Sequence, residues 1–298
     1  MRDSTGNEHW FVFDGHRVFY RRAGTGDSIV FLPNATLTGH LWEHQVGHFR
    51  ATHQVITVDL PGFGRSDRFE TGTTLALYVR WLERFVADLE LAPVVLVGNC
   101  IGSLSALHYA ARRPEAVSAL VLLNTLTSEV NRAGLGRLAD IPNSRLQGPP
   151  VRWYMRHMPR RQQERFLYVR GQFGPIGDAT GEAYREHTRR CFADPTTRLA
   201  YFDLGRDLAN WVLPEPDPLA HLPPLCWIWG EANRLLPLET GRRQLEILRP
   251  EEVHILERCG YAAAWETPNE VNRIIEGFLA RHGAARHGTA EAPAGTRH

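Results

Sequence analysis

The sequence predicts an α/β fold: a mostly parallel, eight-stranded sheet flanked by helices, with a helical insertion near the middle of the chain. Two observations support this prediction. Short apolar runs that fit buried strands alternate with amphipathic segments that fit helices. Between residues 127 and 221 these apolar runs stop, and Arg, Trp, Tyr and Phe become frequent.

The strand and helix segments follow one another in a regular order. Residues 10–21 alternate in polarity around Asp14-Gly15, which predicts a β-hairpin. Further buried strands are expected at 28–32, 54–59, 93–98, 118–123, 225–230 and 252–256. Helices are expected at 74–91, 101–112, 240–248 and 268–281. Strands that alternate with helices favour a parallel sheet covered on both faces.

One core with one insertion accounts for the 298 residues. We expect an α/β core from residues 1–126 and 222–281, a helical lid over 127–221, and a disordered tail over 282–298. A lid at this position is expected to cover the C-terminal edge of the sheet and to shape a substrate pocket, with Trp153 and Tyr154 in its lining. Extra packing without a role in binding is the alternative.

Composition excludes several classes of protein. The net charge of +1 predicts no bulk attraction to nucleic acid or to an anionic membrane. The first residues contain no apolar run typical of a signal peptide, and no apolar stretch is long enough to span a bilayer. The four cysteines lack CxxC spacing, which argues against a zinc site or a dense disulfide framework. We therefore expect a cytoplasmic protein without metal or cofactor, and the sequence leaves the oligomeric state open.

The basic residues are of one kind. The sequence contains no lysine, so all 34 basic residues are Arg. We interpret this as GC-rich codon usage, which favours a bacterial source.

Three stretches of the core resemble one known family. Residues 98–102, GNCIG, lie between an apolar strand and a helix and resemble the nucleophile elbow of α/β-hydrolases, G-x-nucleophile-x-G. Residues 59–67, DLPGFGRSD, resemble the stretch that follows the fourth strand in that family. Residues 224–233 and 258–271 resemble its last two strands and last helix. The resemblance covers the chain except the lid and tail, and it implies the α/β-hydrolase fold.

The resemblance places Cys100 at the nucleophile position, where most members have Ser or Asp. A thiol at the amino end of a helix is expected to have a lowered pKa. The alternative is a small, inert, buried residue. The resemblance also implies an oxyanion hole made by the backbone N–H groups of Ala35 and Ile101, with the Asn34 side chain as a further donor.

The other two catalytic positions of the family are replaced. Asn233 stands at the acid position and Tyr261 at the base position, and Asn124 stands where some members carry the acid after the sixth strand. Replacing both residues avoids a buried carboxylate without its partner. We expect the Asn233 and Tyr261 side chains to satisfy each other with one hydrogen bond.

A displaced histidine is the alternative general base. His40 is the best candidate, because it lies in the loop that follows Ala35, and we expect it to line the substrate pocket as well. A surface or packing role is the alternative for it and for the other histidines considered, which are His44, His108, His157 and His187.

Three functions remain open at this stage. The first is an enzyme of specialised metabolism that acts on a small carbonyl compound, free or thioester-linked. Loss of the water-activating His then disfavours hydrolysis relative to acyl transfer, cyclisation, isomerisation or lyase chemistry. The second is a conventional Cys-dependent hydrolase of an ester, thioester or lactone that uses a displaced His. The third is a catalytically inactive binding module.

Overall fold

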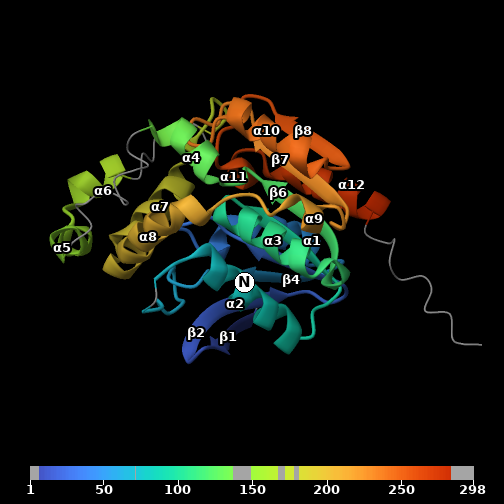
Figure 1. The fold of residues 1–298 in the computed structure, drawn as a ribbon, viewed down its shortest axis with the longest axis horizontal. Helices are drawn as coiled ribbons and strands as arrows, with labels where there is room; N and C mark the ends of the chain where they lie inside the picture. Colours follow the sequence, from blue (N-terminus) through green and yellow to red (C-terminus); the bar gives the residue numbers. More distant parts are fainter. Residues whose placement is uncertain (1–6, 71, 137–148, 167–171, 178–180, 283–298) are drawn as a thin grey trace, which may run out of the picture.

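The computed structural model describes residues 7–70, 72–136, 149–166, 172–177 and 181–282. Eight strands form one sheet in the order β1-β2-β4-β3-β5-β6-β7-β8 (Figure 1). The strands are β1 (Asn7–Phe13), β2 (His16–Ala23), β3 (Ser28–Leu32), β4 (Gln54–Val58), β5 (Val94–Asn99), β6 (Val117–Leu123), β7 (Leu225–Gly230) and β8 (Glu252–Leu256). The β1–β2 and β2–β4 pairs are antiparallel and the others are parallel, so the α/β-hydrolase fold expected from the sequence is confirmed.

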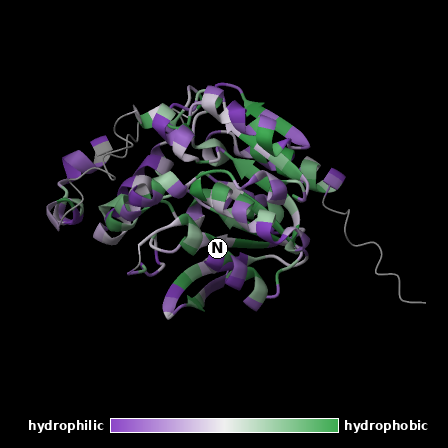
Figure 2. Cartoon of the chain, in the orientation of Figure 1, coloured by the Kyte–Doolittle hydropathy of each residue, from purple (hydrophilic) through white to green (hydrophobic). Residues whose placement is uncertain are grey.

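Helices cover both faces of this sheet. Alternate residues of β3 belong to two separate apolar clusters: Val30 and Leu32 to one, Ile29 and Phe31 to the other. This two-residue period is the one that a strand buried on both faces requires. Figure 2 shows hydrophobic residues along the central strands. The core helices are α1 (Glu43–Phe49), α2 (Leu75–Asp88), α3 (Ile101–Arg112), α10 (Leu238–Leu248), α11 (Ala263–Glu266) and α12 (Pro268–His282).

The helix expected at 74–91 ends three residues early. The Thr74 side chain accepts a hydrogen bond from the backbone N–H of Leu77 and caps the start of α2. After Asp88 the chain turns through Glu90, whose φ of 52° is left-handed and cannot continue a right-handed helix.

The insertion between β6 and β7 is helical in its described part. Its helices are α4 (Ser128–Leu135), α5 (Pro149–His157), α6 (Arg160–Phe166), α7 (Glu182–Ala193), α8 (Pro195–Asp207) and α9 (Pro216–Leu219). Helices α7 and α8 lie beside the core, whereas α5 and α6 lie at the outer end of the molecule (Figure 1). No helix in the described part of the chain is long and apolar enough to cross a membrane. The tail expected over 282–298 lies outside the described residues after His282.

The contact between α3 and the end of β3 depends on Gly102. A Cβ atom at this position would lie 2.5 Å from the carbonyl oxygen of Leu32 and 2.6 Å from that of Pro33. Both oxygens belong to the backbone, so neither can rotate away as a side chain could. Gly102 therefore lets the helix that carries Cys100 pack directly against the β3 end.

We predict that Gly102→Ala lowers the free energy of unfolding by about 2 kcal/mol or more, because overpacking displaces backbone. Gly47→Ala is the matched control, since a Cβ there meets nothing within 4 Å in helix α1. This control should gain up to about 1 kcal/mol from helix propensity. Urea unfolding followed by circular dichroism measures both changes, and equal stability of the two variants would contradict the packing argument.

Candidate active site

Cys100 occupies the turn between β5 and α3, as predicted. Its backbone dihedrals are φ 56° and ψ −111°, a conformation that costs free energy in a residue with a side chain. Its side chain is buried, with 6% of the residue exposed. The turn fixes the direction in which the sulfur points.

Three donors face the Cys100 sulfur. The backbone N–H groups of Ile101 and Ala35 and the hydroxyl of Tyr261 are directed at it, and each lowers the pKa of the thiol. Asn34, which precedes Ala35, in turn lowers the pKa of Tyr261. The structure thus brings together Cys100, Tyr261 and the loop residues that the sequence indicated. Their catalytic roles stay predictions.

Burial outweighs these donors at Cys100. The loss of solvent raises the pKa of the thiol to about 11, although hydrogen bonding from Tyr261, Ile101 and Ala35 opposes this rise. The expected lowering of the pKa at the helix N-terminus is therefore wrong. The groups that shift this pKa include no cation, and the helix terminus by itself does not compensate for removing a thiolate from water. Cys100 is a neutral thiol at neutral pH.

Tyr261 and Asn233 are also neutral. Burial raises the pKa of Tyr261 well above 10, so its hydroxyl is a donor and not a base. Asn233 does not bond to the Tyr261 side chain as expected. Its Nδ2 donates instead to Oδ1 of Asn124 at 3.0 Å, and its Oδ1 accepts from the backbone N–H of Leu236 at 2.9 Å. The expected pair with Tyr261 does not form, because Asn124 and Leu236 already engage both polar atoms of the Asn233 amide.

Asn124 connects the loops at this edge of the sheet. Its left-handed backbone, φ 45°, directs the side chain between the ends of β7 and β8. Oδ1 accepts from the Gly230 N–H at 3.2 Å, and Nδ2 donates to the carbonyl oxygen of Tyr261 at 3.1 Å. Its position at the alternative acid site was visible in the sequence, but its bracing role was not.

Glu266 connects the Tyr261 loop to the lid. Its carboxylate accepts from the backbone N–H of Gly174 at 2.8 Å and from that of Gly260 at 2.9 Å. Burial raises the pKa of this carboxyl, and the two N–H groups oppose that rise. Since Gly174 belongs to the insertion, this contact ties the insertion to the loop that places Tyr261.

Two lid tyrosines approach Cys100, and sequence analysis missed both. Tyr184 on α7 and Tyr201 on α8 each have a pKa raised first by burial and then by the charge that Cys100 would carry. Asn34 lowers the pKa of Tyr184, yet the Tyr184 hydroxyl makes no hydrogen bond of good geometry. No motif marks these residues, because their place depends on how the insertion docks on the core.

Trp153 and Tyr154 do not line the site, so that prediction is wrong. They are 63% and 41% exposed. The Trp153 ring packs 4.8 Å from that of His157, and the Tyr154 hydroxyl donates to Gln162. Both lie on α5 at the outer end of the lid (Figure 1). Apolar character alone did not reveal which lid helix faces the core.

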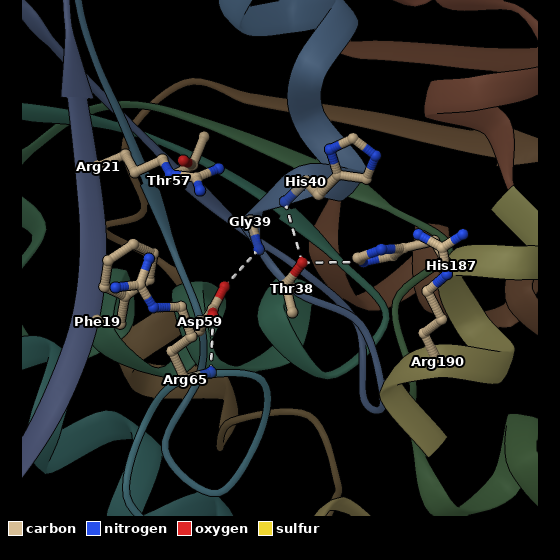
Figure 3. Close-up of a pocket in the computed structure, with 10 residues that line it drawn as sticks. All are labelled: Phe19, Arg21, Thr38, Gly39, His40, Thr57, Asp59, Arg65, His187 and Arg190. Carbon is tan, nitrogen blue, oxygen red and sulfur yellow. Dashed lines mark hydrogen bonds between the residues drawn. The ribbon is translucent and has the colours of Figure 1, made fainter. Parts of the chain in front are cut away.

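His40 lies in a separate pocket of about 340 Å³ (Figure 3). His40 Nδ1 lies 3.1 Å from Oε2 of Glu43, and its ring lies 4.6 Å from that of His187. The groups that shift the pKa of Cys100 include no histidine, so the structure does not bring His40 to Cys100 as a base. The pocket is lined by Phe19, Arg21, Thr38, Gly39, His40, Thr57, Asp59, Arg65, His187 and Arg190.

The loop between β3 and α1 is held on two sides of this pocket. Asp59 accepts hydrogen bonds from the backbone N–H groups of Gly39 at 2.8 Å and Arg65 at 2.9 Å. On the lid side, Oγ1 of Thr38 lies 2.9 Å from Nε2 of His187 (Figure 3). These contacts fix the loop that also carries Asn34 and Ala35.

One cluster in the described part of the chain has the composition of a metal site. Potential ligand atoms of Cys226, Glu252 and His254 lie within 4.8 Å of one another on β7 and β8. However, Arg281 donates to both carboxylate oxygens of Glu252, at 2.9 and 2.8 Å. A cation would have to displace this guanidinium. The expectation of no metal and no cofactor stays a prediction.

Known proteins resemble most of the chain. A sequence profile of the alpha/beta hydrolase family matches residues 29–274. The chain is 27% identical over 281 residues to the 2-hydroxy-6-oxononadienedioate/2-hydroxy-6-oxononatrienedioate hydrolase of Escherichia coli, covering 89% of this chain and 91% of that protein.

Solved structures share the architecture at lower identity. A thermophilic esterase from Thermogutta terrifontis has a TM-score of 0.71 at 19% identity, covering 93% of this chain and 100% of the other. A hydrolase from Pseudomonas aeruginosa has a TM-score of 0.73 at 19% identity, covering 92% and 98%. At such identities the likeness shows the fold alone.

We predict an unusual pH dependence for alkylation of Cys100 by iodoacetamide. With a pKa of about 11, its rate should keep rising beyond pH 9, where an ordinary thiol reaches its midpoint. Tyr261→Phe removes a group that lowers this pKa, so alkylation at pH 9 should become slower. Tyr154→Phe is the control and should match the wild type. Peptide mass spectrometry measures the rates, and a plateau below pH 9 would contradict the raised pKa.

His187 should make the lid contact sensitive to acid. Burial, His40 and Arg190 lower the pKa of His187 from 6.5 to about 4. Because the folded value is depressed, its stabilisation is complete above pH 6.5 and declines as the pH falls toward 4. His187→Gln keeps a donor for Thr38 without titrating, so its melting temperature should fall less between pH 7 and pH 5. His157→Gln, on the outer lid, should show the full wild-type decline.

Proposed function

Since the chain belongs to the alpha/beta hydrolase family, we propose that it is an enzyme that transforms a small carbonyl compound at Cys100 without activating water. The N–H groups of Ala35 and Ile101 are directed at the Cys100 sulfur, and a substrate bound against this sulfur would accept hydrogen bonds from them through its carbonyl oxygen. The Tyr261 hydroxyl is directed at the same sulfur and would stabilise or protonate the negative charge that develops on this oxygen.

The observation that carries this proposal is the absence of a base among the described groups around Cys100. The thiol and the Tyr261 phenol hold their protons at neutral pH, and the third position is an amide. General base catalysis contributes about 10²–10⁴ to a rate, so hydrolysis loses more than reactions that need no activated water. Acyl transfer, cyclisation, isomerisation and lyase chemistry fit this arrangement, without a cofactor.

Cys100 acts in this proposal as a neutral group. With a pKa of about 11, only about one molecule in ten thousand carries the thiolate at pH 7. A covalent adduct would need a proton acceptor close to the sulfur. We therefore assign the main chemical role to Tyr261 and the two backbone donors, with Cys100 shaping the site.

Hydrolysis is the second candidate, and the curated relatives favour it, because the Escherichia coli protein is named a hydrolase. It requires a displaced histidine. Among the lid histidines, His187 on α7 is the nearest in sequence to Tyr184. Its Nε2, however, already contacts the Thr38 hydroxyl and lies 3.4 Å from the Cys191 sulfur. Hydrolysis would need a rearrangement of this contact.

Turnover in ¹⁸O-labelled water tests the proposal. The protein would be incubated with esters, thioesters, lactones and hydroxyketones, and products would be identified by mass spectrometry. We expect conversion without ¹⁸O in any carboxyl group that forms. Fast conversion that adds one ¹⁸O to each new carboxyl group would establish hydrolysis instead.

With a substrate in hand, variants separate the roles. Tyr261→Phe should lower kcat by about 10²–10³, the usual cost of losing one donor to a developing oxyanion. Cys100→Ala should retain turnover, and Tyr154→Phe should match the wild type. If Tyr261→Phe is unimpaired, Tyr261 is not the acid.

Restoring a base should restore hydrolysis. We predict that Tyr261→His raises hydrolysis of an acyl thioester about 10²-fold, since an imidazole can accept the Cys100 proton. Adding Asn233→Asp should give little more, because its carboxylate would face Oδ1 of Asn124, itself an acceptor. Tyr261→Phe is the control and should show no gain. Thiol release monitored by absorbance measures the rates.

A further inference from the structure

We propose that the Cys100 site takes an uncharged carbonyl compound with a hydroxyl group on the carbon next to the carbonyl, and that this hydroxyl binds between Asn34 and Tyr184. This inference rests on the proposed function and specifies its substrate class.

Two buried polar atoms at the site lack well-formed hydrogen bonds. Asn34 is 3% exposed and Tyr184 is 1% exposed, and neither Oδ1 of Asn34 nor the Tyr184 hydroxyl makes a hydrogen bond of good geometry, although the Asn34 side chain approaches the Tyr184 hydroxyl closely enough to lower its pKa. Buried polar groups in native proteins are nearly always paired, because an unpaired one has lost its water without compensation. A polar group of the ligand is the partner that this site is built to receive.

These atoms lie where they can contact a bound carbonyl compound. Asn34 directly precedes the donor Ala35. Its side chain approaches the hydroxyls of Tyr184 and Tyr261 and lowers the pKa of both. Tyr184 is close enough to Cys100 for a charge on the sulfur to raise its pKa. A carbonyl oxygen held by Ala35 and Ile101 would therefore place its neighbouring carbon beside Asn34 and Tyr184.

A hydroxyl is the group that fits both partners. It donates one hydrogen bond and accepts others. It can thus donate to the Asn34 oxygen and accept from the Tyr184 hydroxyl at the same time. It also satisfies the Asn34 amide whichever of the two amide atoms faces the ligand.

The surroundings exclude a charged substituent at this point. Cys100, Asn34, Tyr184 and Tyr261 are neutral, and the groups that shift the pKa values of Cys100 and Tyr261 include no cation. Among the carboxyl groups, it is Glu266 whose charge raises the pKa of Tyr184, and this charge is negative. A substrate carboxylate would be buried here without a counter-ion, at a large cost. The substrate thus differs from the dioates named for the Escherichia coli relative.

Three bromomethyl carbonyl probes test the inference through Cys100 itself. They are bromoacetone, 1-bromo-3-hydroxypropan-2-one and bromopyruvate. In each case the sulfur forms a bond to the bromomethyl carbon, bromide leaves with the bonding electrons, and the thiol proton passes to buffer. Peptide mass spectrometry gives the rate constant at Cys100, divided by that of glutathione to remove intrinsic reactivity.

The hydroxylated probe should react about tenfold faster than bromoacetone after this correction, as expected for one added hydrogen-bonding group in a buried site. Bromopyruvate should be the slowest of the three. Tyr184→Phe keeps the ring and removes the hydroxyl, and it should bring the ratio of the two neutral probes close to one. Asn34→Leu, of similar volume, should do the same. Tyr154→Phe, on the outer lid, should preserve the wild-type ratio.

The outcomes separate this inference from the function on which it rests. If no probe labels Cys100 in the folded protein while unfolded protein is labelled, the carbonyl site itself is wrong. If the neutral probes label Cys100 with a ratio near one, the site stands and the unpaired atoms bind only water. Fastest labelling by bromopyruvate would show a cationic subsite, and a ratio that survives both Tyr184→Phe and Asn34→Leu would place the hydroxyl elsewhere. Each of these results overturns the inference.

Discussion

The close contact between Gly102 and the carbonyl oxygens of Leu32 and Pro33 holds the Cys100 turn against the end of β3. The same contact brings the loop that begins at Pro33 beside the first turn of α3. As a result the N–H groups of Ala35 and Ile101, which come from two different loops, point at one sulfur atom. A side chain at position 102 would separate these loops, and the two donors would no longer converge.

The groups that face Cys100 in this site carry no charge. Burial and the pairing of neighbouring amides both account for this neutrality. Burial opposes ionisation of both Cys100 and Tyr261. The acid and base positions are linked by amides, from Asn233 through Asn124 to the Tyr261 carbonyl. A carboxylate at 233 would need a positive or donating partner, and Asn124 presents an oxygen there. The uncharged residues at positions 124, 233 and 261 therefore depend on one another.

The lid completes the site through α7 and α8, not through its more exposed helices. Tyr184 and Tyr201 come from these two helices. The Thr38–His187 contact joins α7 to the loop that carries Ala35, and Glu266 joins Gly174 to the loop that carries Tyr261. Movement of α7 would thus disturb both the tyrosine and the backbone donor, which couples closure of the site to its geometry.

The sequence by itself determined the fold, the turn at Cys100 and the unusual identities at positions 233 and 261. These depend on short-range patterns: two-residue and 3.6-residue periods, and a glycine-flanked turn between a strand and a helix. The tertiary structure alone decided the raised pKa of Cys100, the partners of Asn233, and the approach of Tyr184 in place of Trp153 and Tyr154. The physical reason is that burial and side-chain pairing depend on residues far apart in the chain. No local pattern reports which helix of an insertion docks on the core, nor how much water remains around a thiol once it has docked.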